Sequence, residues 1–340
     1  MEKILVGLDI GSKNIKAIQL DRQKTTPVLL AAGYIATPGG LVSAGAKEEQ
    51  ILANSINRLT HEMKLSTSAV CASLPTSGVI TRIIEMPLLS ESELESAITW
   101  EAEPYIPVPM ANVKIDYCIV EKNEESKKMK ILLVAAPIVI IEKYIRIIDL
   151  AGLKPVALET EIIAAARSVT RTLPTISNLL IITYGVKITE ITLLHNSLLI
   201  YTKSFPFGSD TLVRSLVNEL GFEEATAEEY FKTYGLDEDK LEGKISKVLM
   251  PFFNNLIIET EKTIGYFKEL YPKEEISTLV LCGGGAKLPG LIMTLTKNLS
   301  LDSQISNPFT NIAVDPAVLP VLLPDAPLYT TAIGLAQKEI

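Results

Sequence analysis

The chain contains two similar stretches separated by 174 positions, and this repetition constrains its fold more than any other feature. Residues 4–20 and 179–194 each read as an apolar strand, a turn that contains glycine, and a second strand. Gly11 aligns with Gly185 at this offset (185 − 11 = 174). One interpretation is a duplicated α/β domain whose two hairpin turns face each other across a cleft. The other is that unrelated hairpins look alike.

Two facing hairpin turns of this kind would suit a polyphosphate. Glycine permits a positive φ and lets backbone N–H groups approach a ligand closely, and successive N–H groups form an anion-binding nest. Asp9 and Lys13 of the first stretch align with Thr183 and Lys187 of the second. An acid such as Asp9 can hold Mg²⁺ through water, since this ion keeps most of its hydration shell.

Composition limits the classes of function. The 340 residues predict two domains with a smaller inserted piece. The net charge of −8 argues against a nucleic-acid binder. A mean hydropathy of +0.28 predicts a large core, or an apolar surface reserved for a partner. The three cysteines and two histidines lie far apart, which excludes a paired Cys/His zinc site and favours a reducing cytoplasm.

We expect no direct membrane insertion. The N-terminal apolar run is broken by Asp9 and reads as a strand rather than a signal peptide. The longest apolar run, residues 131–141, contains Pro137 and is far shorter than the roughly 20 residues that span a bilayer.

Hydrophobic periodicity and turn residues divide the chain into elements. Predicted strands lie at 4–10, 14–20, 27–35, 68–74, 78–86, 113–120, 130–136, 154–159, 179–185, 187–194, 197–205 and before the glycines at 283–285. Predicted helices lie at 47–64, 90–103, 138–151, 160–170, 209–220, 225–234, 243–270, after Pro289, and at 329–338. The proline-rich stretch 307–327 reads mostly as loop.

Three segments resemble the nucleotide loops of the actin, Hsp70 and sugar-kinase superfamily. LDIGSKNIK at 8–16 resembles the first phosphate loop, and TYG at 183–185 stands at the place of the second. LCGGGAKLPG at 281–290 resembles the adenosine loop, where glycines let the backbone lie beside the nucleoside. The order of LDIGSKNIKAIQL, SLPTSGVITRIIEMP, WEAEPYIPVP, AGLKPVALETE, GGGAKLPGL, NPF and AIGLA is similar to the PilM family of type IV pilus assembly proteins over nearly the whole chain.

The resemblance implies an α/β fold of duplicated actin-like (ribonuclease H-like) domains with an inserted subdomain placed as in the cell-division protein FtsA. The implied boundaries are 1–77 and 154–175 for domain 1, 78–153 for the insertion, 176–305 for domain 2, and 306–340 for a return to domain 1. It also implies that ATP binds between the halves. The N-terminal cytoplasmic tail of the membrane protein PilN would lie in a surface groove and dock the chain to the inner-membrane pilus assembly complex.

The resemblance and the hairpin argument together supply the candidate site. The expected nucleotide-binding residues are Asp9, Gly11, Ser12, Lys13, Asn14, Lys16, Thr183, Gly185, Lys187, Glu229, Lys232, Gly283, Gly284, Gly285 and Lys287, with Asp9 also holding Mg²⁺ through water. Plainer interpretations stand beside four of these assignments. Asp9 fits an aspartate that caps a turn. Lys16 fits the outward face of a strand, the triple glycine fits a tight strand-to-helix connection, and Glu229 with Lys232 fits a surface salt bridge.

One departure from the superfamily pattern bears on catalysis. The second phosphate loop usually starts with aspartate, and here that position is Thr183. Since positioning and charge stabilisation supply most of phosphoryl-transfer catalysis, we expect nucleotide binding with slow or absent hydrolysis. Two alternatives stay open. A small-molecule kinase would need a base beside its acceptor, and an FtsA-like filament protein would be expected to carry a C-terminal membrane helix beyond the last domain helix.

Overall fold

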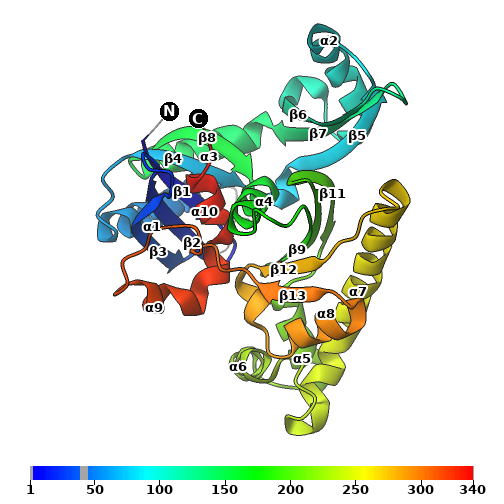
Figure 1. Ribbon diagram of the computed structural model, residues 1–340. Helices are drawn as coiled ribbons and strands as arrows, with labels where there is room; N and C mark the ends of the chain where they lie inside the picture. Colours follow the sequence, from blue (N-terminus) through cyan, green and yellow to red (C-terminus); the bar gives the residue numbers. More distant parts are fainter. Residues whose placement is uncertain (1–2, 39–44, 340) are drawn as a thin grey trace.

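Three β-sheets organise the protein, whose computed structural model describes residues 3–38 and 45–339 (Figure 1). The first has the strand order β3-β2-β1-β4-β8 and the second the order β11-β10-β9-β12-β13. Their bounds are β1 (Ile4–Ile10), β2 (Asn14–Asp21), β3 (Val28–Ala36), β4 (Ala69–Leu74), β8 (Lys154–Thr160), β9 (Asn178–Tyr184), β10 (Thr189–His195), β11 (Leu198–Phe205), β12 (Thr278–Cys282) and β13 (Asp302–Ile305). The two sheets therefore share one topology.

The two large sheets also share one register. In the first hairpin Asp9 lies opposite Lys16, and in the second Thr183 lies opposite Glu190. Both pairs are related by the same offset, because 183 − 9 and 190 − 16 both equal 174. A one-residue slip would move every side chain to the other face of its sheet, so a shared register supports duplication rather than a chance likeness.

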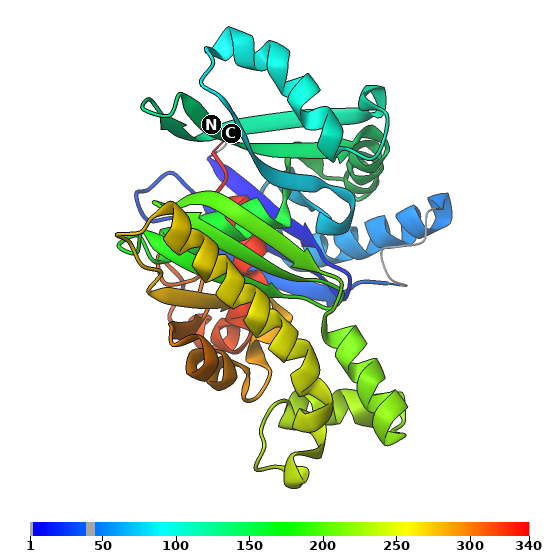
Figure 2. The same cartoon turned by 90° about the vertical axis from the view of Figure 1, so that its right-hand side faces the viewer.

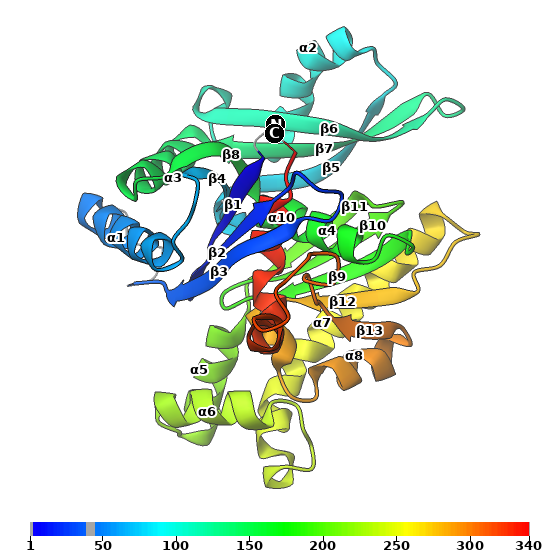
Figure 3. The same ribbon diagram turned by 60° about the vertical axis from the view of Figure 1, so that its left-hand side comes forward.

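A smaller sheet lies at one end of the molecule, beside both large ones (Figures 1 and 3). Its order is β5-β7-β6, all antiparallel, with bounds β5 (Ile80–Pro87), β6 (Val113–Asn123) and β7 (Lys128–Pro137). Helix α2 (Glu91–Ala102) covers its outer face with Leu94 and Ile98. The helix starts at the predicted capping box, in which the Glu93 carboxylate accepts the Ser90 backbone N–H.

The remaining helices pack on the large sheets or on one another. They are α1 (Ala46–Glu62), α3 (Ile138–Leu150), α4 (Glu161–Thr172), α5 (Ser209–Leu220), α6 (Glu224–Tyr234), α7 (Lys244–Leu270), α8 (Leu291–Leu299), α9 (Leu319–Leu322) and α10 (Thr330–Ala336). The long helix α7 runs across one face of the second sheet (Figure 2). Helix α10 returns the chain to the first sheet and packs on β1 and α4.

Two predictions of local structure were wrong. Strand β13 was not expected, because its four residues carry too few apolar side chains to stand out, and its parallel pairing with β12 is what makes it a strand. The stretch 319–327 was expected to be mostly loop but belongs to α9 and a 3₁₀ helix. Pro320 and Pro324 stand in the first turns of these helices, where proline is tolerated, and only Pro327 lies inside the 3₁₀ helix.

Among the described residues, one helical stretch is long and apolar enough to cross a membrane. It is Leu319–Ala336, and 61% of it is buried inside the protein. Ala332, Ile333 and Ala336 belong to a core cluster with Ile18 and Leu20 of β2. This packing is that of a core helix.

Candidate functional site

The two hairpin turns are built alike. The Gly11 N–H donates to the Asn14 carbonyl at 3.1 Å, and the Gly185 N–H donates to the Ile188 carbonyl at 3.0 Å. A Cβ at Gly11 would lie 2.9 Å from the Asn14 oxygen, and one at Gly185 would lie 2.7 Å from the Ile188 oxygen. Neither glycine has a positive φ. Close approach within the turn, and not the predicted left-handed conformation, therefore explains both glycines.

Asp9 lies at the end of β1 with only 4% of its surface exposed. Its Oδ2 is 2.7 Å from Lys16 Nζ, and its Oδ1 accepts the Ser73 hydroxyl at 3.1 Å. Lys16 therefore points to Asp9 rather than outward into solvent, which excludes the plainer interpretation. A water-bound metal remains compatible with this carboxylate, because Mg²⁺ needs only one or two carboxylates beside water and phosphate oxygens.

Two further carboxyl groups join Asp9, and sequence reasoning missed both. Glu161 is the first residue of α4, and its Oε2 accepts the Thr76 hydroxyl at 3.0 Å. Loss of solvent raises the pKa of Glu161 to about 8, with further upward contributions from Asp9 and Glu190. Carboxyl groups from the first half and the second half of the chain therefore lie near enough to influence one another.

Glu190 projects from β10 opposite Thr183 and is 4% exposed. Its Oε1 accepts the Ser204 hydroxyl at 3.2 Å, and burial raises its pKa to about 7. The second hairpin thus places a carboxyl group on β10, directly opposite Thr183, which stands where the superfamily pattern has aspartate. The 174-residue offset aligns Glu190 with Lys16, so the sequence alone could have identified Glu190 as a candidate site residue.

A second group of charges connects the first hairpin turn to helix α6 of the second half of the chain. Lys13 Nζ lies 2.5 Å from Glu228 Oε1 of α6, and Lys232 Nζ lies 2.8 Å from the same oxygen. The hydrogen bond from Lys13 is the largest cause that lowers the pKa of Glu228 to about 2. The carboxylate that pairs with Lys232 is therefore Glu228, and the expected Glu229 is exposed to solvent instead. The plainer interpretation, a salt bridge between Glu229 and Lys232, is therefore wrong in its acidic partner, because i,i+4 neighbours share a helix face as well as i,i+3 neighbours.

The glycine turn after β12 has a structural requirement of its own. Gly283 adopts φ +83°, and a Cβ at Gly285 would lie 2.1 Å from the ring of Tyr184, which is fully buried. Only at Gly284 would a Cβ meet no more than ordinary contact, with Leu328 at 3.7 Å. Packing within the protein thus requires glycine at two of these three positions, and no bound nucleoside is needed to explain them.

Lys287, just after that turn, forms a second ion pair between the two halves. Its Nζ lies 2.8 Å from Asp325 Oδ1, in the C-terminal segment that returns to the first sheet. Tyr34 of β3 donates to the other oxygen of Asp325 at 3.3 Å. Of the remaining predicted residues, Lys187 is exposed, while Ser12, Asn14 and Thr183 are half-buried at the turns.

The chemistry of the cleft fits a hydrated divalent cation. No three acidic, cysteine or histidine side chains of the described residues come close enough to enclose a metal directly. Mg²⁺ seldom needs such a cage, because one or two carboxylates, waters and substrate phosphates complete its shell. Asp9, Glu161 and Glu190 supply the oxygen type that this ion prefers once they have lost their protons.

Comparison with known proteins agrees with this geometry. The model of the family "Type IV pilus assembly protein PilM" matches residues 7–340. A solved structure of a PilM-PilN type IV pilus biogenesis complex is similar with 26% identity, covering 98% of this chain and 97% of that chain at a TM-score of 0.84.

Two more distant structures share the fold. One is the ethanolamine utilization protein EutJ from Carboxydothermus hydrogenoformans, with 16% identity, 99% and 90% coverage and a TM-score of 0.59. The other is MreB5 of Spiroplasma citri bound to ADP, with 14% identity, 98% and 94% coverage and a TM-score of 0.53. These likenesses confirm the actin-like fold. The match over almost its whole length shows that the chain belongs to the PilM family of type IV pilus assembly proteins.

Proposed function

We propose that this chain is an actin-like scaffold of type IV pilus assembly that binds the N-terminal cytoplasmic tail of a PilN-like inner-membrane protein. The observation that carries the proposal is the similarity to a PilM-PilN complex over 98% of the chain. The chain would lie in the cytoplasm and reach the inner membrane through that partner. Family membership favours this function over the kinase and the FtsA-like filament protein.

We also propose that the chain binds ATP. ATP would lie between the two hairpin turns, with Lys13 and Lys16 as cations for phosphate and Asp9 holding Mg²⁺ through water. Lys187, Lys232, Lys287 and Gly283–Gly285 would surround the rest of the nucleotide. The domain division 1–77, 78–153, 154–175, 176–305 and 306–340 is part of the same proposal, and the three sheets support it.

We expect weak or absent hydrolysis. Thr183 stands where the superfamily pattern has aspartate, so the carboxylate that would help to hold the metal or position an attacking water is missing there. The bound nucleotide would then set the separation of the two halves rather than be consumed.

The test is a titration of the purified full chain with a synthetic PilN-like N-terminal peptide, with and without Mg-ATP. We expect saturable binding in at least one state, together with phosphate release at the level of a buffer blank or only slightly above it. A scrambled peptide is the control. Absence of peptide binding in both states removes the scaffold function, and brisk phosphate release removes the expectation of weak hydrolysis.

A further inference from the structure

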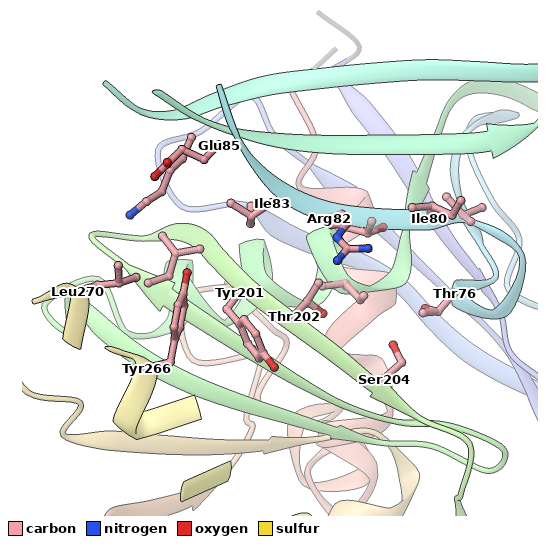
Figure 4. A pocket seen from close by; sticks show the side chains of 15 residues that line it. Thr76, Ile80, Arg82, Ile83, Glu85, Tyr201, Thr202, Ser204, Tyr266 and Leu270 are labelled. Carbon is pink, nitrogen blue, oxygen red and sulfur yellow. The ribbon is translucent and has the colours of Figure 1, made fainter. Parts of the chain in front are cut away.

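Helix α2 stands on the outer face of the small sheet. Its Leu94 and Ile98 belong to one core cluster with Ile84 of β5. The preceding residue of that strand, Ile83, lines a cavity of about 630 Å³ towards β11 (Figure 4). Since successive side chains of a strand point to opposite faces, α2 and the cavity lie on opposite sides of the small sheet. The solvent side of α2 is thus turned away from the large sheets (Figure 1).

Trp100 lies on that solvent side and is the only tryptophan of the chain. It is 76% exposed, more than any other large apolar residue that the structure describes. Tyr105 and Val108, a few positions further along the chain, are also exposed. Isolated apolar residues on a surface are common and need no explanation. An indole differs from them, because tryptophan is enriched among the residues that dominate binding energy at interfaces and its ring face attracts cations.

The chain around Trp100 is uniformly acidic. Residues 83–113 contain six glutamates and no aspartate, lysine, arginine or histidine, so their net charge is −6. The whole chain has a net charge of −8, which leaves −2 for the other 309 residues (340 − 31 = 309). The negative charge of this protein is therefore concentrated in one short segment, and that segment carries the exposed indole.

Most of these carboxylates have no basic partner in the fold. Glu85 pairs with Lys128, and Glu93 caps α2. Four exposed carboxylates have no described lysine, arginine or histidine within ion-pair distance: Glu91, Glu95, Glu101 and Glu103. Glu103 follows Trp100 by three positions, a spacing that places both side chains on one helix face.

The indole and the carboxylates select the same kind of partner. Unpaired carboxylates attract lysine and arginine, and the planar guanidinium of arginine also stacks on aromatic faces. The segment already contains one such contact, because the Arg82 guanidinium carbon lies 4.5 Å from the centroid of the Tyr105 ring. The same negative charge disfavours the anionic surface of a membrane. It also disfavours the equivalent segment of a second copy.

We propose that Trp100 and the carboxylates of α2 form a docking surface for an arginine-rich segment of another protein, with one arginine stacked on the indole. This surface is separate from the nucleotide cleft, and the inference does not depend on the proposed function. It adds a second protein contact on the opposite side of the small sheet from the cavity.

Trp100 itself supplies the readout, because no other tryptophan contributes to the emission of the full chain. The probe is a short synthetic peptide in which arginines alternate with leucine and alanine. We expect a saturable blue shift of the emission and weaker quenching by acrylamide. The control peptide, in which glutamine replaces every arginine, should cause neither change. No shift with the arginine peptide, or an equal shift with the control peptide, would overturn the inference.

Anisotropy of the labelled arginine peptide compares variants of the full chain. Trp100→Ala changes an exposed side chain and should retain the fold, but we expect it to weaken binding at least about tenfold. The double variant Glu101→Gln with Glu103→Gln should weaken binding at low salt and reduce its dependence on salt. Met293→Ala is the matched control, because Met293 is a 71% exposed apolar residue of α8. It should stay within about twofold of the wild type.

Three further measurements distinguish other occupants of this surface. Phosphatidylglycerol vesicles should leave the Trp100 emission unchanged, and a blue shift would make the membrane the occupant. The emission should not depend on protein concentration, and a dependence that Glu101→Gln removes would make a second copy the occupant. A saturating PilN-like N-terminal peptide should not displace the arginine peptide. Displacement would assign the surface to the PilN-like tail, and any of these three contrary results would overturn the inference.

Discussion

At the residue scale, the carboxyl groups of Glu161 and Glu190 connect pH to stability. Their pKa values, about 8 and about 7, lie above the usual 4.5 because burial disfavours the charged form. The folded state therefore retains protons that the unfolded state has released above pH 4.5. It follows that these groups make the protein less stable as pH rises from about 4.5 to about 8.

Glu161→Gln and Glu190→Gln should remove this dependence, since glutamine resembles the protonated carboxyl group. We expect each variant to have a Tm close to that of the wild type at pH 5 and a Tm a few degrees higher at pH 8. Differential scanning calorimetry at both pH values measures the effect. Glu229→Gln, at an exposed position of α6, is the control and should show no such difference. An equal Tm change at both pH values would contradict the assigned protonation.

At the scale of elements, the contact of α10 with β1 and α4 is a contact between backbones. A Cβ at Gly7 would lie 1.9 Å from the Ala332 carbonyl oxygen, and one at Gly334 would lie 1.8 Å from the Ala164 carbonyl oxygen. Helix α10 therefore comes close to β1 at Gly7 and close to α4 at Gly334, and neither contact leaves room for a Cβ. The AIGLA segment contains one of these two glycines, so its composition has a steric reason.

Gly334→Ala should destabilise the protein by about 3 kcal/mol, since an added methyl group must push α10 away from α4. Gly265→Ala is the matched control in a helix, because no atom lies within 4 Å of its added Cβ. We expect that variant to gain roughly 0.5–1 kcal/mol from the higher helix propensity of alanine. Urea denaturation followed by circular dichroism compares them, and equal stability of the two variants would refute the close packing.

At the scale of the whole molecule, the Lys13–Glu228 and Lys287–Asp325 pairs join the two halves on either side of the cleft. Both pairs are partly exposed, so each contributes at most about 1 kcal/mol to folding. Because the two pairs connect the two halves, we expect them to affect nucleotide release more than stability. If ATP lies between the halves as proposed, we expect these pairs to slow its release.

Glu228→Gln should therefore speed nucleotide release more than it lowers stability. We expect dissociation of a fluorescent ATP analogue to accelerate about threefold while the Tm changes by less than about 2 °C. Stopped-flow displacement by unlabelled ATP measures the rate. Glu242→Gln, which loses an exposed pair with Lys244, is the control and should leave the rate unchanged. Unaltered release from Glu228→Gln would show that this pair does not gate the cleft.

The sequence by itself determined the duplication and the two hairpin turns, because strand pairing across a short turn depends on residues fewer than 20 positions apart. It also determined the actin-like fold, through seven motifs in a set order. Only the tertiary structure decided which distant charges meet. Lys13 and Glu228, which form an ion pair, are 215 positions apart. Such contacts depend on how whole sheets pack, and the local hydrophobic periodicity of a sequence carries no information about that packing.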